Sequence, residues 1–103
     1  MGKGKVAAQV GHASVQAFLN AGVSHPLEVE AWLASGQKKI CVKAPDETTF
    51  KQLRRLAAER GIAHHLVRDA GHTQIPSGSP TVLALGPAGE STLDELTGHL
   101  KLL

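Results

Sequence analysis

The sequence predicts a single domain of the α/β class, in which helices pack against a small β-sheet. Three observations support this prediction. The chain has 103 residues, a length that suits one domain spanning residues 1–103. Hydrophobic residues make up 42% of it, which is typical of a globular chain and not of a disordered one. Segments with helical periodicity alternate with short β-branched or apolar runs, as expected when helices cover a sheet.

The first predicted helix runs from about Gly4 to Asn20, with Gly22 as its stop signal. Its polar stripe consists of Lys5, Gln9, His12 and Gln16. A second stripe, about 100° round the helix, consists of Val6, Val10, Ala13 and Ala17. We expect the apolar stripe to face the core and the polar stripe to present a cation, an amide and an imidazole together. The alternative is a helix whose polar face is simply solvated.

Two further helices and a first strand are predicted in the middle of the chain. Ser24 is expected to cap a short helix that stops at Gly36. Residues 39–44 are rich in β-branched side chains and precede a proline, so they predict a strand. The next helix runs from Asp46 to a stop signal at Gly61. Its expected core face consists of Phe50, Leu53 and Ala57.

The second half of the chain predicts two strands and a final helix. Residues 63–69 are expected to form the first of these strands, and residues 70–80, with two glycines and two prolines, are expected to form a loop. Residues 81–85 are a nearly continuous apolar run, which favours a strand buried on both faces. The last helix starts near Ser91, and its inward side chains are Leu93, Leu96 and Leu100. Three strands are few for four helices.

The charge distribution is more informative than the net charge of +2. Basic residues form local clusters, and residues 1–27 contain no acid. A basic face without acids can meet phosphate. These clusters consist of Lys3 and Lys5, then Lys38, Lys39 and Lys43, then Lys51, Arg54, Arg55 and Arg60. The chain has only three aromatic residues, so a base-stacking platform of aromatic rings is not expected.

The cysteine and histidine content bears on compartment and cofactors. The single cysteine, Cys41, excludes an internal disulfide and favours a reducing compartment. No signal peptide and no apolar run near 18 residues are present, so we expect a cytoplasmic protein that does not span a membrane. The adjacent His64 and His65 point to opposite faces of a strand, and no metal-ligand spacing occurs. We therefore expect no metal and no cofactor.

The most informative loop begins with a carboxylate at the end of a predicted strand. Asp69 is followed by a glycine-containing turn, and Thr73 lies four residues further on. Loops at strand ends are where sites collect in α/β sheets. An Asp beside a hydroxyl can orient that hydroxyl or a water molecule and act as a weak general base. The alternative is a turn in which Thr and Ser hydroxyls cap backbone groups.

Five spaced motifs, in order along nearly the whole chain, resemble the archaeal and eukaryotic type of peptidyl-tRNA hydrolase. They are Gly2-Lys3-Gly4-Lys5-Val6-Ala7-Ala8-Gln9 with His12-Ala13, Gly36-Gln37-Lys38-Lys39-Ile40 with Val42-Lys43, Asp69-Ala70-Gly71-His72-Thr73-Gln74-Ile75 with Gly78, Thr81-Val82-Leu83 with Gly86-Pro87, and Thr97-Gly98-His99-Leu100-Lys101-Leu102-Leu103. The resemblance implies metal-independent hydrolysis of the ester between a peptide and the 3′ end of tRNA, which recycles tRNA. It implies catalytic roles for Lys5, Asp69 and Thr73. It also implies contacts to substrate or tRNA by Gln9, His12, Lys3, Lys43, Thr97, Gly98 and Lys101.

The resemblance further implies a mixed four-stranded sheet with helices on both faces. Members of this family carry a strand before the Gly-Lys-Gly-Lys motif, and Met1 stands in its place here. We therefore expect this chain to supply three of the four strands, and a homodimer is one way to fill the gap. The alternative function is that of a non-catalytic RNA-binding or protein-interaction relative, but the presence of Lys5, Asp69 and Thr73 favours the enzyme.

Overall fold

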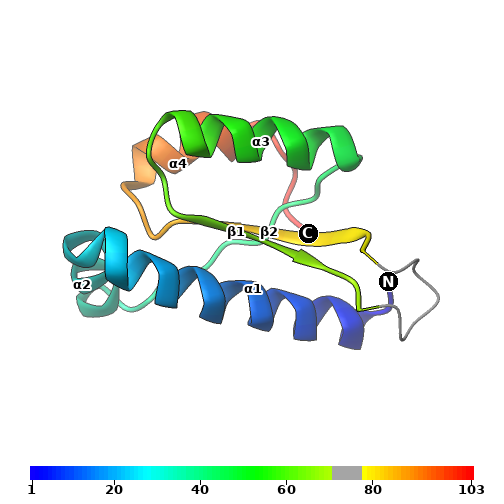
Figure 1. Cartoon of the computed structure of the whole chain (residues 1–103), viewed down its shortest axis with the longest axis horizontal. Coiled ribbons are helices and arrows are strands. Elements are labelled where there is room, and N and C mark those ends of the chain that lie inside the picture. The colour runs from blue at the N-terminus through cyan, green and yellow to red at the C-terminus, as the bar shows by residue number, and fades with distance from the viewer. Residues whose placement is uncertain (71–77) are drawn as a thin grey trace.

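Helices cover both faces of a small sheet in the computed structural model, which describes residues 1–70 and 78–103. Figure 1 shows α1 and α2 below the sheet and α3 and α4 above it. This layering confirms the predicted class. In chain order the elements are α1 (Lys3–Ser24), α2 (Pro26–Ala34), α3 (Glu47–Glu59), β1 (His64–Arg68), β2 (Pro80–Leu85) and α4 (Glu90–Thr97).

The sheet consists of β1 and β2 paired antiparallel, with His64 opposite Leu85 and Val67 opposite Val82. The register shifts between Val67 and Arg68, since Arg68 faces Pro80 and Thr81 becomes an extra residue on β2. Such a bulge changes the face to which a side chain points. The sequence predicted that β2 would be buried on both faces, but its side chains are only half-buried. Each strand of a two-stranded sheet is an edge strand, so no further strand covers its side.

The predicted third strand at residues 39–44 is wrong. Among the described residues, this segment forms a single isolated bridge, between Val42 and Leu102. Two backbone hydrogen bonds flank this bridge: the Lys43 N–H donates to the Lys101 carbonyl (2.8 Å), and the Leu103 N–H donates to the Cys41 carbonyl (3.1 Å). β-branched residues favour a strand only when a partner strand and a buried face are present. Neither condition is met here, and the described sheet has two antiparallel strands in place of three in a mixed sheet.

Two apolar clusters hold the helices on the sheet. Above it, Leu53 and Ala57 of α3 pack with Ile62 and with Leu96 of α4. Leu93 also packs against this cluster, so the predicted inward positions Leu93 and Leu96 are confirmed. Leu100 packs there too, but it lies beyond the end of α4 at Thr97 and not within the helix as predicted. The second cluster lies below the sheet and consists of Ala21, Val29 and Ala63, with Phe18 packed against it.

The boundary between α1 and α2 differs from the prediction in two respects. Helix α1 does not stop at Gly22 but continues to Ser24, because glycine weakens a helix without ending it when the following turn still packs. The Ser24 hydroxyl donates to the Asn20 carbonyl at 3.2 Å and does not cap α2. His25 occupies the N-cap position instead, and Pro26 is the first residue of α2 as expected. At the start of α3 the predicted cap is confirmed, since the Asp46 carboxylate accepts from the Thr49 N–H and hydroxyl, both at 2.9 Å. Among the helices described, none is long and apolar enough to cross a bilayer.

Candidate active site

An ion pair joins the first turn of α1 to the end of β1. The Lys5 ammonium donates to Asp69 Oδ1 at 2.7 Å. The Asp69 side chain is fully covered, whereas 27% of the Lys5 side chain stays exposed. Side chains alternate between the two faces of a strand, so His65, Val67 and Asp69 point toward α1. The sequence placed Lys5 and Asp69 in the site, and the structure brings them into contact across 64 positions of the chain.

The backbone of Asp69 also closes the hairpin. Its N–H donates to the Ser79 carbonyl at 2.8 Å, and its carbonyl accepts from the Gly78 N–H at 2.9 Å. These bonds hold the backbone just beyond the end of the β1–β2 ladder. The carboxylate that meets Lys5 is therefore attached to a backbone position held on both sides. A catalytic group benefits from such rigid support.

The ion pair borders an open hollow of about 760 Å³ between α1 and β1. All four residues of the predicted polar stripe, which are Lys5, Gln9, His12 and Gln16, line it. His65, Val67 and Arg68 line it from the side of β1. His12 is exposed and thus accessible to a ligand in the hollow. Lys3, the first residue of α1, is also exposed and lies in the same turn as Lys5.

Gln9 lies deeper than the sequence predicts. The buried row of α1 consists of Gln9, Ala13, Ala17 and Ala21, whereas Val6 and Val10 are only half-buried. The Gln9 amide donates to the Thr81 hydroxyl at 3.2 Å, and that hydroxyl donates to the Val67 carbonyl at 3.1 Å. The bulge turns Thr81 toward α1 and thereby supplies the partner that a buried amide requires.

Thr81 is a site residue that the sequence reasoning did not single out. It appears in a resemblance motif, but nothing in its neighbourhood marks the bulge, because a register shift depends on the pairing with β1. Its hydrogen bond from Gln9 ties α1 to the sheet on the same side as the Lys5–Asp69 pair.

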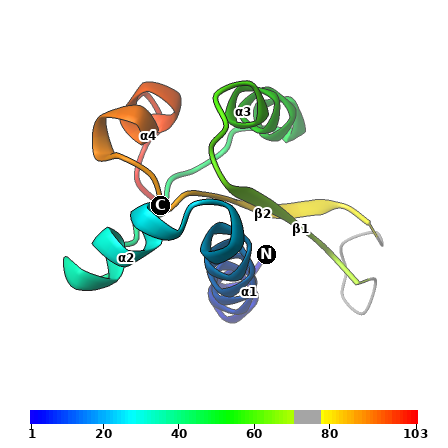
Figure 2. The ribbon, with the colours of Figure 1, turned by 60° about the vertical axis from the view of Figure 1, so that its left-hand side comes forward.

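The remaining predicted site residues are distributed differently. Thr73 lies outside the described residues. Lys43 and Lys101 lie next to each other through their backbone hydrogen bond of 2.8 Å. Thr97 and Gly98 end α4, on the face of the sheet opposite α1, as Figures 1 and 2 show. The structure therefore does not bring Thr97 and Gly98 to the ion pair.

Thr97 and Gly98 have local structural roles at the end of α4. The Thr97 hydroxyl donates to the Leu93 carbonyl at 3.1 Å. Gly98 donates its N–H to the Asp94 carbonyl at 2.7 Å. A Cβ atom at position 98 would lie 2.6 Å from that carbonyl oxygen and 2.7 Å from an Asp94 carboxylate oxygen. Glycine is therefore required at this position by packing.

The ion pair is suited to ester chemistry. An ammonium group stabilises negative charge that develops on a carbonyl or leaving oxygen. A carboxylate can accept a proton from water or a hydroxyl group. Across residues 1–70 and 78–103, no three His, Cys, Asp or Glu side chains gather as a metal site would require.

Comparison with known proteins agrees with the resemblance seen in the motifs. A family model described as peptidyl-tRNA hydrolase PTH2 matches residues 1–103. The peptidyl-tRNA hydrolase of Methanocaldococcus jannaschii is 46% identical over 103 residues, covering all of this chain and 90% of the relative. That of Thermococcus onnurineus is 47% identical, covering all of this chain and 87% of the relative. The mouse protein named peptidyl-tRNA hydrolase 2, mitochondrial, is 50% identical over 102 residues, and the match spans only 56% of its length.

Proposed function

The chain belongs to the peptidyl-tRNA hydrolase PTH2 family, and on this premise we propose that it hydrolyses the ester bond between a peptide, or an N-blocked amino acid, and the 3′ end of tRNA. The observation that carries the proposal is the contact between Lys5 and Asp69 at the edge of an open hollow. Both residues belong to the motifs on which the family resemblance rests.

The proposed reaction is the addition of water to the ester carbonyl. Asp69 orients a water molecule, directly or through the Thr73 hydroxyl, and accepts a proton as the water oxygen bonds to the carbonyl carbon. The bond between that carbon and the ribose oxygen then breaks, the ribose oxygen takes up a proton, and the peptide leaves as a carboxylic acid that ionises. Lys5 stabilises the negative charge on the carbonyl oxygen or on the departing ribose oxygen.

The geometry of the ion pair is compatible with this role for Lys5. An ammonium group has three N–H donors, and Asp69 Oδ1 accepts one of them. Asp69 thus holds Nζ in place while its other donors can turn toward an oxyanion in the hollow. We propose that Gln9, His12 and Lys3 contribute to the ribose and phosphate side of the same hollow. Contacts by Lys43, Lys101, Thr97 and Gly98 with the substrate remain predictions. Because Thr97 and Gly98 lie on the face of the sheet opposite α1, we expect them to contact parts of the tRNA away from the ester.

The test is release of an N-acetylated amino acid from its tRNA in the presence of a chelator. Lys5→Met and Asp69→Asn should each lower turnover, by ~10²–10³-fold for a lost oxyanion donor and by ~10²–10⁴-fold for a lost general base. Lys38→Met is a matched control, because it removes an exposed ion pair with Glu90 and should leave turnover unchanged. Full activity in either site variant excludes that residue from the mechanism. If the wild-type chain binds tRNA but releases no amino acid, the non-catalytic binding function is supported instead.

A cytoplasmic location and a homodimer also belong to the proposal. One relative is named as mitochondrial, so location needs a direct test by fractionation of the cells that make the protein. For a homodimer, the exposed apolar side chains of α1 are the candidate contact, and they include Val15, Leu19 and Val23. Sedimentation of the wild-type chain and of Leu19→Lys would show whether this face joins two copies.

A further inference from the structure

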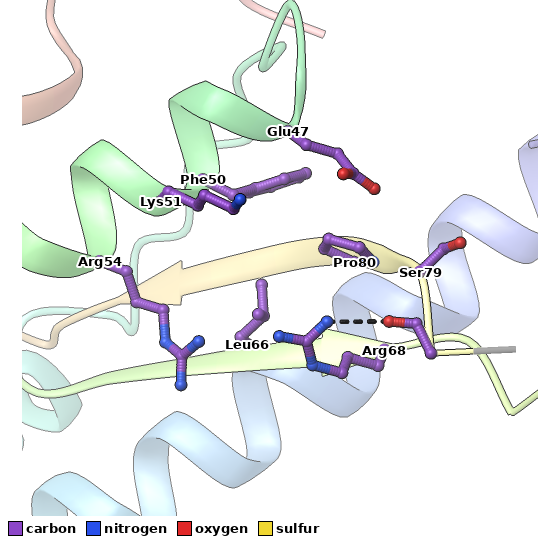
Figure 3. Close-up of a pocket in the computed structure, with 9 residues that line it drawn as sticks. Glu47, Phe50, Lys51, Arg54, Leu66, Arg68, Ser79 and Pro80 are labelled. Atoms are coloured by element: carbon purple, nitrogen blue, oxygen red, sulfur yellow. Dashed lines mark hydrogen bonds between the residues drawn. The ribbon is translucent and has the colours of Figure 1, made fainter.

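A second hollow lies on the opposite face of the sheet, between α3 and the ends of β1 and β2. Its volume is about 420 Å³. In Figure 3, Lys51 and Arg54 extend from α3 and Leu66 and Arg68 from β1. We call this hollow the basic cleft and define its cations as Lys51, Arg54 and Arg68.

Two of the three cations of the basic cleft lie on one face of α3, and the third comes from β1. Glu47, Lys51 and Arg54 stand at i, i+4 and i+7 on α3, so they follow one stripe of the helix. Arg68 reaches the same space from β1 because strand residues alternate between faces, and Leu66 precedes it on that side. Three cations thus face one carboxylate, Glu47, over an apolar floor. A cleft with an excess of positive charge beside apolar walls concentrates its field on an anion.

The basic residues of this helix region fall into two groups. Arg55 pairs with Glu59 at 3.9 Å, and Arg60 pairs with Glu95 at 2.7 Å. In contrast, no ion pair to Lys51 or Arg54 is found within residues 1–70 and 78–103. Among the described residues, the cations that face away from the cleft are therefore paired with neighbouring carboxylates, whereas Lys51 and Arg54 are not.

Arg68 connects the basic cleft to the candidate active site. It lines both hollows, and the next residue, Asp69, forms the ion pair with Lys5. The Arg68 guanidinium donates to the Gly78 carbonyl at 2.8 Å, which ties its side chain to the end of the hairpin. A polyanion whose terminus reaches Lys5 and Asp69 can therefore pass the end of β1 and continue into the cleft.

We propose that the basic cleft binds the phosphate backbone of the tRNA portion of the substrate. This inference rests on the proposed function, which places the esterified 3′ end of tRNA in the hollow beside Lys5. Phosphate contacts position a nucleic acid without reading its sequence. The cleft therefore contributes affinity for the tRNA body, and the ion pair carries out the chemistry.

The test compares two double variants that lose the same charge. Lys51→Gln with Arg54→Gln alters the cleft, and Arg55→Gln with Arg60→Gln is the matched control on the paired cations. Each is assayed with N-acetylaminoacyl-tRNA and with N-acetylaminoacyl-adenosine, which retains the ester but lacks the phosphate backbone. We expect the cleft variant to raise KM for the tRNA substrate by roughly tenfold while kcat and the adenosine reaction stay unchanged. The slope of log affinity against log salt should become shallower by about 2, and the control variant should show neither effect.

Several outcomes would overturn the inference. It is wrong if both double variants raise KM equally, if the salt slope of the cleft variant matches that of the wild-type chain, or if the adenosine reaction weakens as much as the tRNA reaction. Failure of the proposed function is distinguishable from these results. In that case the wild-type chain hydrolyses neither substrate, while its binding of deacylated tRNA and the weaker binding by the cleft variant still support the cleft as a tRNA site.

Discussion

The ion pair between Lys5 and Asp69 predicts an unequal response to loss of either partner. Lys5→Met leaves a carboxylate whose side chain has no exposed surface, whereas Asp69→Asn leaves an ammonium group with 27% of its side chain exposed. The exposed ammonium can turn toward water. The Asp69 carboxylate has no exposed surface, and its backbone is held by two hydrogen bonds at the end of the hairpin. We therefore expect Lys5→Met to destabilise the fold more than Asp69→Asn.

The magnitudes follow from the distance and the burial. At 2.7 Å and an effective dielectric constant of about 20, the gross attraction is about 6 kcal/mol, and desolvation of the two charges offsets much of it. For Lys5→Met we expect a penalty of about 3–5 kcal/mol, the range for loss of one partner of a buried ion pair. For Asp69→Asn we expect about 2 kcal/mol, within the range for a hydrogen bond to a charged group.

The assay is urea-induced unfolding, followed by the fluorescence of Trp32, the single tryptophan of the chain. The free energy of unfolding is compared at pH 7 for the wild-type chain and both variants. An Asp69→Asn penalty equal to or larger than that of Lys5→Met would refute the reasoning.

Three further predictions concern residues around the site. Thr81→Val removes the partner of the buried Gln9 amide and should lower the free energy of unfolding by about 1–3 kcal/mol. Turnover should also fall, because α1 carries the proposed catalytic lysine. Unchanged turnover would show that this contact does not position the helix. Gly98→Ala forces a Cβ against Asp94 and should cost about 1–3 kcal/mol, with KM for the adenosine substrate unchanged; a higher KM would place Gly98 at the ester. Hydrogen bonds from the amide and hydroxyl three residues on lower the pKa of Asp46 below its usual 3.8, so its contribution to stability is present at pH 7 and lost as the pH falls through that lowered pKa. The melting temperature of Asp46→Ala should accordingly lie below that of the wild-type chain at pH 7 and approach it in acid, and a difference that persists at pH 2 would contradict this explanation.

Local patterns predicted the helices well because each helix contains its own hydrogen bonds and its own periodicity. Leu53 and Ala57 of α3 and Leu96 of α4 are buried as their spacing predicts. The strand at residues 39–44 was predicted by the same kind of local pattern and does not form. A strand needs hydrogen-bond partners from elsewhere in the chain, and the partner here is a short C-terminal segment that contributes one bridge.

The candidate site shows the same division. The sequence alone was enough to select Lys5, Asp69, Gln9 and His12, because the helical stripe and the ordered motifs can be recognised without a structure. Thr73 was selected on the same grounds and lies outside the described residues. The roles assigned to all of them remain predictions, while the contact between Lys5 and Asp69 is established by the fold.

The sequence by itself determined the family, the helical elements and the identity of the residues that meet in the site. The tertiary structure alone decided that β2 carries a bulge at Thr81, that Gln9 is buried against it, and that Arg68 lies between two hollows on opposite faces of the sheet. The physical reason is that motifs and helical periodicity depend on neighbours within a few residues. Register, burial and charge neutralisation depend on residues brought together from distant parts of the chain.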